Sequence, residues 1–156
     1  GGNIGDFFVH KNIANIVPSK NQKHENIQTL SAIEYGLKVL KIPNIIILGH
    51  SNCGGVEYSY KILKNNKIIN NFEYVNKWVS CLNSTFKKIP ENLSENEQIT
   101  FFEKENIKQS IKNLNDYYFI DKLIKENKLN IIGMWYQINS GLIEYLDNKN
   151  NFIKLI

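Results

Sequence analysis

The run of β-branched residues at positions 45–48 constrains the fold more than any other feature of the sequence. Ile-Ile-Ile-Leu lies between Pro43 and Gly49 and shows no polar alternation, which is typical of a strand buried on both faces, as in a parallel sheet. Residues 26–41, just before it, carry apolar side chains every three or four positions and are predicted to be helical. A glycine-rich loop at 49–55 and a second predicted helix at 56–64 follow the strand.

The rest of the chain continues this alternation. We predict helices over 72–86, 94–114 and 119–128, and strands over 7–10 and 129–138. Ser94 and Glu97 have the spacing of a capping box, and Asn127 suits a helix end. The helix at 72–86 is apolar on two faces, which favours burial against a partner. The pattern predicts one domain over residues 1–156, of the α/β class, with a mostly parallel sheet flanked by helices.

Composition narrows the classes of partner. No apolar run approaches the roughly 20 residues that a membrane span needs, so we expect no membrane association. The formal net charge is +4, but every basic residue is a lysine, and the lysines are scattered among acidic residues. Base recognition depends largely on arginine, so we expect no nucleic-acid binding. The chain has 2 cysteines, too few for a disulfide scaffold, and a reducing cytoplasm is the expected location.

The loop at 49–55 combines residues that can carry chemistry. Ligands of open α/β sheets lie beyond the carboxyl ends of strands, where His50 and Cys53 are expected. Imidazole and thiolate are preferred zinc ligands, and the neighbouring glycines would allow sharp backbone turns. The helix that follows would favour a thiolate and a bound anion. Three interpretations stay open on spacing alone: half of a metal site, a Cys53 nucleophile with His50 as base, or a buried cysteine and a loop histidine without a role.

Several segments in order are similar to one known family. Residues 5–17 (GDFFVHKNIANIV) resemble a Gly-[Asp/Glu]-Leu-Phe-Val-His-Arg-Asn-Val-Ala-Asn segment, and residues 31–36 (SAIEYG) resemble a helix that follows it. Residues 46–55 (IILGHSNCGG) are similar to the family's most specific motif. Residues 133–138 (GMWYQI), followed by Gly141, resemble a late Gly-Trp-x-Tyr strand. The chain thus resembles a β-class carbonic anhydrase over nearly its whole length.

The resemblance implies a reaction and a partial site. It implies zinc-dependent reversible hydration of CO2 to bicarbonate, with His50 and Cys53 as two of the three protein ligands of Zn²⁺ and the Gly54 amide orienting bicarbonate. The third ligand belongs to a Cys-x-Asp-x-Arg segment, whose Asp–Arg pair orients the nucleophile. This segment would precede Gly1, so the chain is expected to be N-terminally incomplete and inactive, or nearly so, by itself. Cys81 lies on a predicted helix far from the loop and is expected to be a packing residue.

The resemblance also suggests regulation and assembly. One branch of the family has an inhibitory bicarbonate site, to which Lys11 and Tyr136 would correspond, although lysine lacks the guanidinium fork of the arginine found there. We expect a homodimer or a higher homo-oligomer. His10 and His24 are weak candidates for proton shuttles. The alternatives to the enzyme are a degenerate non-catalytic homologue and a Cys53-dependent hydrolase.

Overall fold

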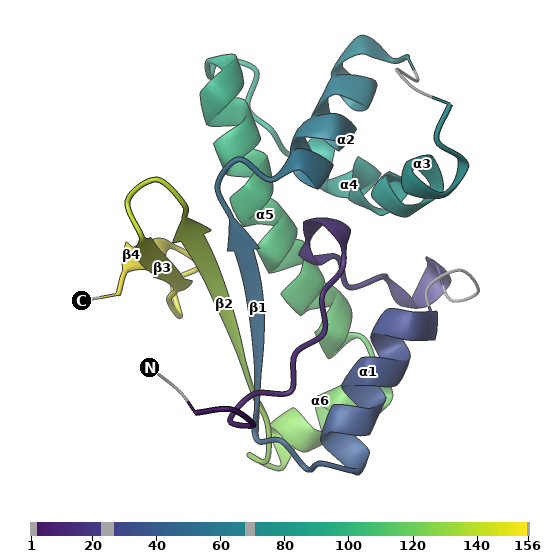
Figure 1. The fold of residues 1–156 in the computed structure, drawn as a ribbon, viewed down its shortest axis with the longest axis vertical. Coiled ribbons are helices and arrows are strands. Elements are labelled where there is room, and N and C mark those ends of the chain that lie inside the picture. Colours follow the sequence, from purple (N-terminus) through teal and green to yellow (C-terminus); the bar gives the residue numbers. More distant parts are fainter. Residues whose placement is uncertain (1–2, 23–26, 68–70, 156) are drawn as a thin grey trace.

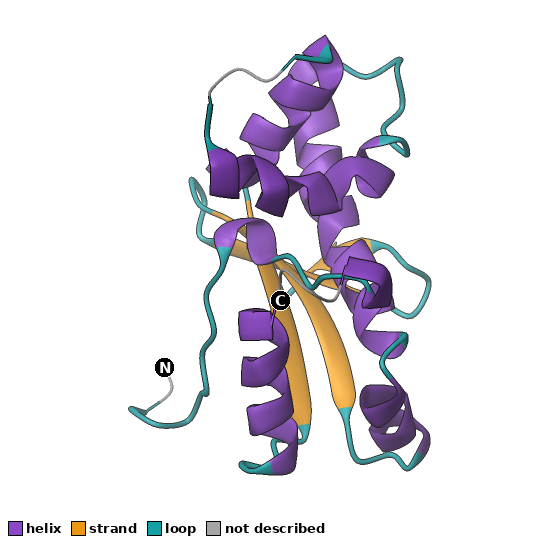
Figure 2. Cartoon of the chain, turned by 90° about the vertical axis from the view of Figure 1, so that its right-hand side faces the viewer, coloured by secondary structure: helices purple, strands orange, loops and turns teal. Residues whose placement is uncertain are grey.

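A computed structural model describes residues 3–22, 27–67 and 71–155. These residues form four strands, six α-helices and three short 3-10 turns, with five of the helices between β1 and β2 (Figures 1 and 2). In chain order they are η1 (Ile13–Asn15), η2 (Lys20–Gln22), α1 (Ile27–Lys38), β1 (Asn44–His50), α2 (Gly54–Asn65), α3 (Glu73–Val79), η3 (Ser80–Leu82), α4 (Asn83–Phe86), α5 (Glu95–Asn115), α6 (Tyr118–Lys125), β2 (Asn130–Gln137), β3 (Leu142–Leu146) and β4 (Phe152–Lys154).

The sheet has the order β1-β2-β3-β4. Strands β1 and β2 are parallel, with His50 opposite Tyr136 in the register. Strand β3 is antiparallel to β2, and β4 is antiparallel to β3. The α/β class and the flanking helices are confirmed, and β1 and β2 are parallel as predicted. The two further strands, which the sequence analysis did not identify, make the described sheet mixed rather than mostly parallel.

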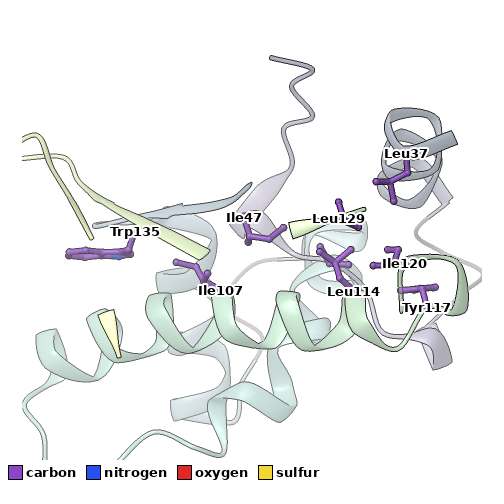
Figure 3. Packing of buried hydrophobic residues seen from close by; sticks show 9 residues of the cluster. Leu37, Ile47, Ile107, Leu114, Tyr117, Ile120, Leu129 and Trp135 are labelled. Atoms are coloured by element: carbon purple, nitrogen blue, oxygen red, sulfur yellow. The ribbon is translucent and has the colours of Figure 1, made fainter. Parts of the chain in front are cut away.

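Helix α5 lies along one face of β1 and β2 and supplies the centre of the core (Figure 3). Ile107 and Leu114 are fully buried there among residues of both strands and of α1 and α6. The helix approaches the strands closely because both carry a glycine beneath it. A Cβ atom at Gly49 would lie 2.8 Å from Ile107 Cδ1, and one at Gly133 would lie 2.9 Å from Ile111 Cδ1. The opposite face of the sheet is exposed at Ile46, Leu48 and Tyr136, so the predicted burial of the strand at 45–48 on both faces is wrong for this chain by itself: α5 covers one face only.

A second cluster fills the space between α2, α4 and α5, above the end of β1 in Figure 1. Cys53, Tyr60, Leu82 and Phe102 are buried in it, together with Ala14 and Ile16 from the N-terminal segment. The loop at residues 49–55, which we call the ligand loop, therefore lies beside this cluster. Because α5 contributes to both clusters, one helix connects the core of the sheet with the surroundings of Cys53.

Two of the predicted elements are wrong in form. Residues 7–10 form no strand, and Phe7, Phe8 and Val9 are exposed. The helix predicted over 72–86 is interrupted by η3 and divides into α3 and α4. Val79, Leu82 and Thr85, one from each of α3, η3 and α4, are buried at a spacing of three residues. The three short segments thus share one buried face despite the interruption.

The remaining helices agree with their patterns. Ser94 and Glu97 form the predicted capping box at the start of α5. Asn127 adopts a φ of 54° just beyond α6, and this left-handed conformation ends the helix. Within the described residues, no helix is long and apolar enough to cross a membrane.

Candidate metal centre

The loop between β1 and α2 is held at both ends by hydrogen bonds to other elements. The Ser51 N–H donates to the Tyr136 carbonyl at 2.9 Å, and the Ile138 N–H donates to Ser51 Oγ at 2.9 Å. These bonds continue the pairing of β1 with β2 by one residue. Asn52 then turns the chain with a φ of 57°, and Cys53 is the N-cap of α2. The loop thus runs directly from the end of β1 into α2.

His50, the last residue of β1, is half-buried, and its ring is oriented by its neighbour. Nδ1 lies 2.9 Å from the Ser51 carbonyl oxygen. A carbonyl can only accept a hydrogen bond, so Nδ1 carries the proton and Nε2 presents a lone pair. Metal-binding histidines are typically oriented in this way, with one ring nitrogen donating to a carbonyl while the other binds the metal.

Cys53 is 5% exposed and packs in the second cluster. It precedes the first turn of α2, where unpaired backbone N–H groups and the helix dipole favour negative charge. Cys81, in contrast, lies in η3 and packs against the same cluster while partly exposed, as expected of a packing residue.

The carboxylate of Glu103 lies directly behind the loop. Its Oε1 accepts the Cys53 N–H at 2.9 Å, and its Oε2 accepts the Trp135 Nε1–H at 3.2 Å. Glu103 is 2% exposed, and this burial raises the pKa of its carboxyl group. The hydrogen bonds from Cys53 and Trp135, and the attraction of the nearby His50, oppose that rise in pKa. A buried acid therefore connects the loop, α5 and β2.

Sequence reasoning did not identify Glu103, although a pattern in α5 points to it. Four polar residues recur at helical spacing on the buried face of α5, and we call them the polar row: Glu103, Asn106, Ser110 and Asn113. The last three bind the backbone of residues 14–17, for example through Asn113 Nδ2, which donates to the Val17 carbonyl at 2.7 Å. Glu103 differs from these three, because it accepts its hydrogen bond from Cys53 in the ligand loop.

The glycines of the loop have a role that differs from the expected one. We expected Gly49, Gly54 and Gly55 to allow sharp turns, but none of them has a positive φ, and Asn52 makes the turn instead. Gly55 is needed for space, since a Cβ atom there would lie 2.5 Å from Ile13 Cγ2. Gly54 has no heavy atom within 4 Å of such a Cβ. Gly54 is exposed in the first turn of α2.

The described residues contain no group of three or more His, Cys, Asp or Glu side chains that could hold a metal ion. His50 and Cys53 nevertheless provide donor atoms that zinc prefers. These are the imidazole Nε2 of His50 and the thiol of Cys53 at a helix N-terminus. They supply two of the four donors that a zinc site typically has.

The two candidates for a regulatory bicarbonate site, Lys11 and Tyr136, do not line a common hollow among the described residues. Lys11 is exposed and lines a hollow of about 270 Å³ with His10, Gln28, Thr29 and other residues. Tyr136 is not among the residues that line this hollow, and it lies at the end of β2 opposite His50. His10 is engaged by Thr29 Oγ1 at 3.2 Å. His24 lies outside the described residues.

Comparison with known proteins decides the family. The model of the carbonic anhydrase family matches residues 1–143, which is most of the chain. The chain belongs to the β-class carbonic anhydrases. Among curated members of this class, beta carbonic anhydrase 3 of Arabidopsis thaliana is 32% identical over 145 residues, which cover 90% of this chain and 55% of that protein. A carbonic anhydrase of Helicobacter pylori is 27% identical, over 100% of this chain and 72% of that protein.

Solved β-carbonic anhydrases have the same fold. The structure of CcaA superposes with a TM-score of 0.88 at 29% identity, covering 98% of this chain and 74% of that one. A tetrameric β-carbonic anhydrase of Sordaria macrospora superposes with a TM-score of 0.77 at 28% identity, over 92% of this chain and 70% of that one. The chain thus spans about half the length of its Arabidopsis relative and about three quarters of the CcaA chain.

Proposed function

We propose that this chain is part of a zinc-dependent enzyme that catalyses CO2 + H2O ⇌ HCO3⁻ + H⁺. The observation that carries the proposal is the His50–Cys53 loop at the carboxyl end of β1, in a chain that the carbonic anhydrase family matches over residues 1–143. His50 Nε2 and the Cys53 thiolate would hold Zn²⁺. The remaining donors would come from outside the described residues, where the resemblance places a Cys-x-Asp-x-Arg segment.

The residues of the chain have distinct tasks in this proposal. When bound, zinc acidifies a water molecule and so supplies a nucleophile for CO2 near neutral pH. The Ser51 carbonyl accepts the hydrogen bond of His50 Nδ1–H, which leaves Nε2 for the metal, and the N-terminus of α2 would stabilise the charge of a metal-bound Cys53 thiolate. The amide of Gly54 would bind an oxygen of bicarbonate, since backbone N–H groups at a helix N-terminus favour small anions.

The assembly and the location are part of the proposal. We propose a homo-oligomer, with support from the tetrameric Sordaria relatives and from the exposed apolar face of the sheet. A cytoplasmic location remains a prediction, because relatives of this chain include proteins named as mitochondrial and chloroplastic. The site at Lys11 and Tyr136 also remains a prediction, and a Lys11→Ala variant that keeps bicarbonate inhibition would count against it.

Zinc content and CO2 hydration test the function. Each is measured in the 156-residue chain and in a form extended upstream, with His50→Ala, Cys53→Ser and the control Cys81→Ser. We expect either ligand variant to lose about 100-fold or more in zinc affinity, because ligands matter more than the residues around them, whereas Cys81→Ser keeps it. Hydration is expected in the extended form with zinc bound. Full activity without zinc, or zinc binding that survives both ligand variants, would refute the proposal.

The same preparations distinguish the alternatives. A Cys53-dependent hydrolase would lose activity on thiol alkylation whether or not zinc is present, whereas a zinc ligand is protected from alkylation by the metal. A non-catalytic homologue would bind zinc or an anion and hydrate no CO2 in the extended form.

A further inference from the structure

The ligand loop has one buried attachment to the helix behind it. Ser51 forms one backbone hydrogen bond to Tyr136 and accepts another at its hydroxyl from Ile138. Neither of these bonds involves the side chain at position 103. Cys53, by contrast, is held through its N–H by Glu103 Oε1 at 2.9 Å. The conformation at the cysteine therefore depends on a single side chain of α5.

A carboxylate suits this place better than other side chains of similar length. Glu103 Oε1 accepts the Cys53 N–H and Oε2 accepts the Trp135 Nε1–H. The backbone N–H of Asn52 is a further donor to this carboxylate. An amide of the same size has one oxygen and one NH2 group, so it would place a donor against one of these donors. Glutamine could keep one bond and would lose the other.

The burial of a charged side chain costs free energy, which other interactions must offset. Glu103 is 2% exposed, and a buried carboxylate is costly unless it is paired and fully hydrogen-bonded. The other members of the polar row hold the backbone of residues 14–17 with neutral side chains. A neutral residue would thus suffice for attaching α5 to its neighbours. The charge is found only at the position next to the ligand loop.

We propose that Glu103 is a positioning residue for the zinc ligands, which holds the Cys53 backbone and Trp135 in one arrangement and places a negative charge behind a bound cation. This inference rests on the proposed function for its metal and on the hydrogen bonds for its geometry. Residues next to metal ligands typically contribute about 10- to 100-fold to metal affinity. The sequence signal is a glutamate in a row of otherwise neutral buried residues.

The test uses Glu103→Ala and Glu103→Gln, with Asn113→Ala as the matched control. Asn113 belongs to the same row, is 8% exposed, and donates to the Val17 carbonyl instead of to the loop. The first measurement is the rate at which iodoacetamide alkylates Cys53 without metal, with the modified cysteine identified by mass spectrometry and Cys81 as the internal reference. The second is the zinc dissociation constant of each variant in the form extended upstream, obtained by competition with a chelator.

We expect alkylation of Cys53 in Glu103→Ala to accelerate by about tenfold or more relative to Cys81, since the released loop opens locally. Zinc affinity is expected to fall by about 10- to 100-fold, with Glu103→Gln intermediate in both measurements. Asn113→Ala destabilises the fold but should leave the ratio of the two alkylation rates and the zinc affinity of the folded chain unchanged.

Alkylation of Cys53 that is as slow in both Glu103 variants as in the wild type would overturn the inference. So would an equal acceleration in Asn113→Ala, which would indicate general loosening of the fold. If the form extended upstream bound no zinc while the alkylation rates followed the expected order, the proposed function would fail and the attachment of the loop by Glu103 would stand. Should Glu103→Ala not fold, Glu103→Gln gives the same comparison with a smaller expected change.

Discussion

Gly54 and Gly55 are adjacent glycines in the first turn of α2, and their surroundings differ. A side chain at Gly54 would meet open space, whereas one at Gly55 would meet Ile13 and Ala14 of η1. The N-terminal segment thus packs directly on the backbone that follows Cys53. At the scale of one residue, a glycine next to the ligand loop allows two segments to approach each other.

Substitution by alanine should separate these two positions. In Gly55→Ala, the new Cβ would lie 3.2 Å from Ala14 Cβ as well as close to Ile13, and overpacking of this kind typically costs about 1–3 kcal/mol. Alanine is favoured over glycine in a helix by up to about 1 kcal/mol, so Gly54→Ala should be neutral or slightly stabilising. Urea unfolding of both variants checks this. Equal free energies of unfolding would contradict the packing argument.

Among the elements, α5 has the largest structural role, because its buried face serves both clusters and carries the polar row. Its start is defined by Ser94 and Glu97. The Ser94 N–H donates to Glu97 Oε2 at 2.9 Å, and the Ser94 hydroxyl donates to the same oxygen at 2.6 Å. The start of the helix therefore depends on an ionised carboxylate.

These bonds predict a pH dependence. The Ser94 hydroxyl and N–H hold the pKa of Glu97 below its ordinary value of 4.5. A carboxyl group whose pKa is lower in the folded state stabilises the fold above its unfolded pKa, and this stabilisation is lost as the pH falls through its folded pKa. The difference in unfolding free energy between wild type and Glu97→Gln should thus be constant near neutral pH and shrink under acidic conditions.

Denaturant unfolding of both proteins across this pH range measures the difference, and an NMR titration of Glu97 measures the pKa itself. Glu95 is a suitable control, since it lies in the same first turn outside the capping box. A Glu97 pKa at or above the ordinary value would show that the capping bonds do not form in solution.

For the whole molecule, the two faces of the sheet differ in their surroundings. α5 covers one face, while Ile46 and Leu48 on the other are 42% and 53% exposed. Contiguous exposed apolar surface of this kind marks interaction sites in soluble proteins. It supports the proposed homo-oligomer, and its position beside His50 means that assembly would also cover one side of the ligand loop.

A charge on this face should weaken self-association. We expect Ile46→Lys to lower the association constant by about tenfold or more, since an unpaired charge would have to be buried in the contact. Lys112→Glu, an exposed position on α5, is the control. Sedimentation velocity over a range of concentrations measures both. Assembly of Ile46→Lys that matches the wild type would place the contact elsewhere.

Local pattern was sufficient for much of the fold. The periodicity of residues 26–41, the β-branched run at 45–48 and the Ser94–Glu97 spacing correspond to α1, β1 and the start of α5. Each of these signals lies within one element, so neighbouring residues determine it. Strands β3 and β4 were not recognised, because short strands depend on pairing partners that no local pattern specifies. Residues 7–10 show the converse, since a β-prone run forms a strand only when another strand pairs with it.

The ligand loop shows the same division. By itself, the sequence determined the chemistry of His50 and Cys53 and their place after a strand, because residue type and order along the chain carry that information. The tertiary structure alone decided which glycine is needed for close packing and that the carboxylate of Glu103 lies behind Cys53, 50 residues away. Burial of a charge depends on donors from other elements, and these come together only when the chain has folded.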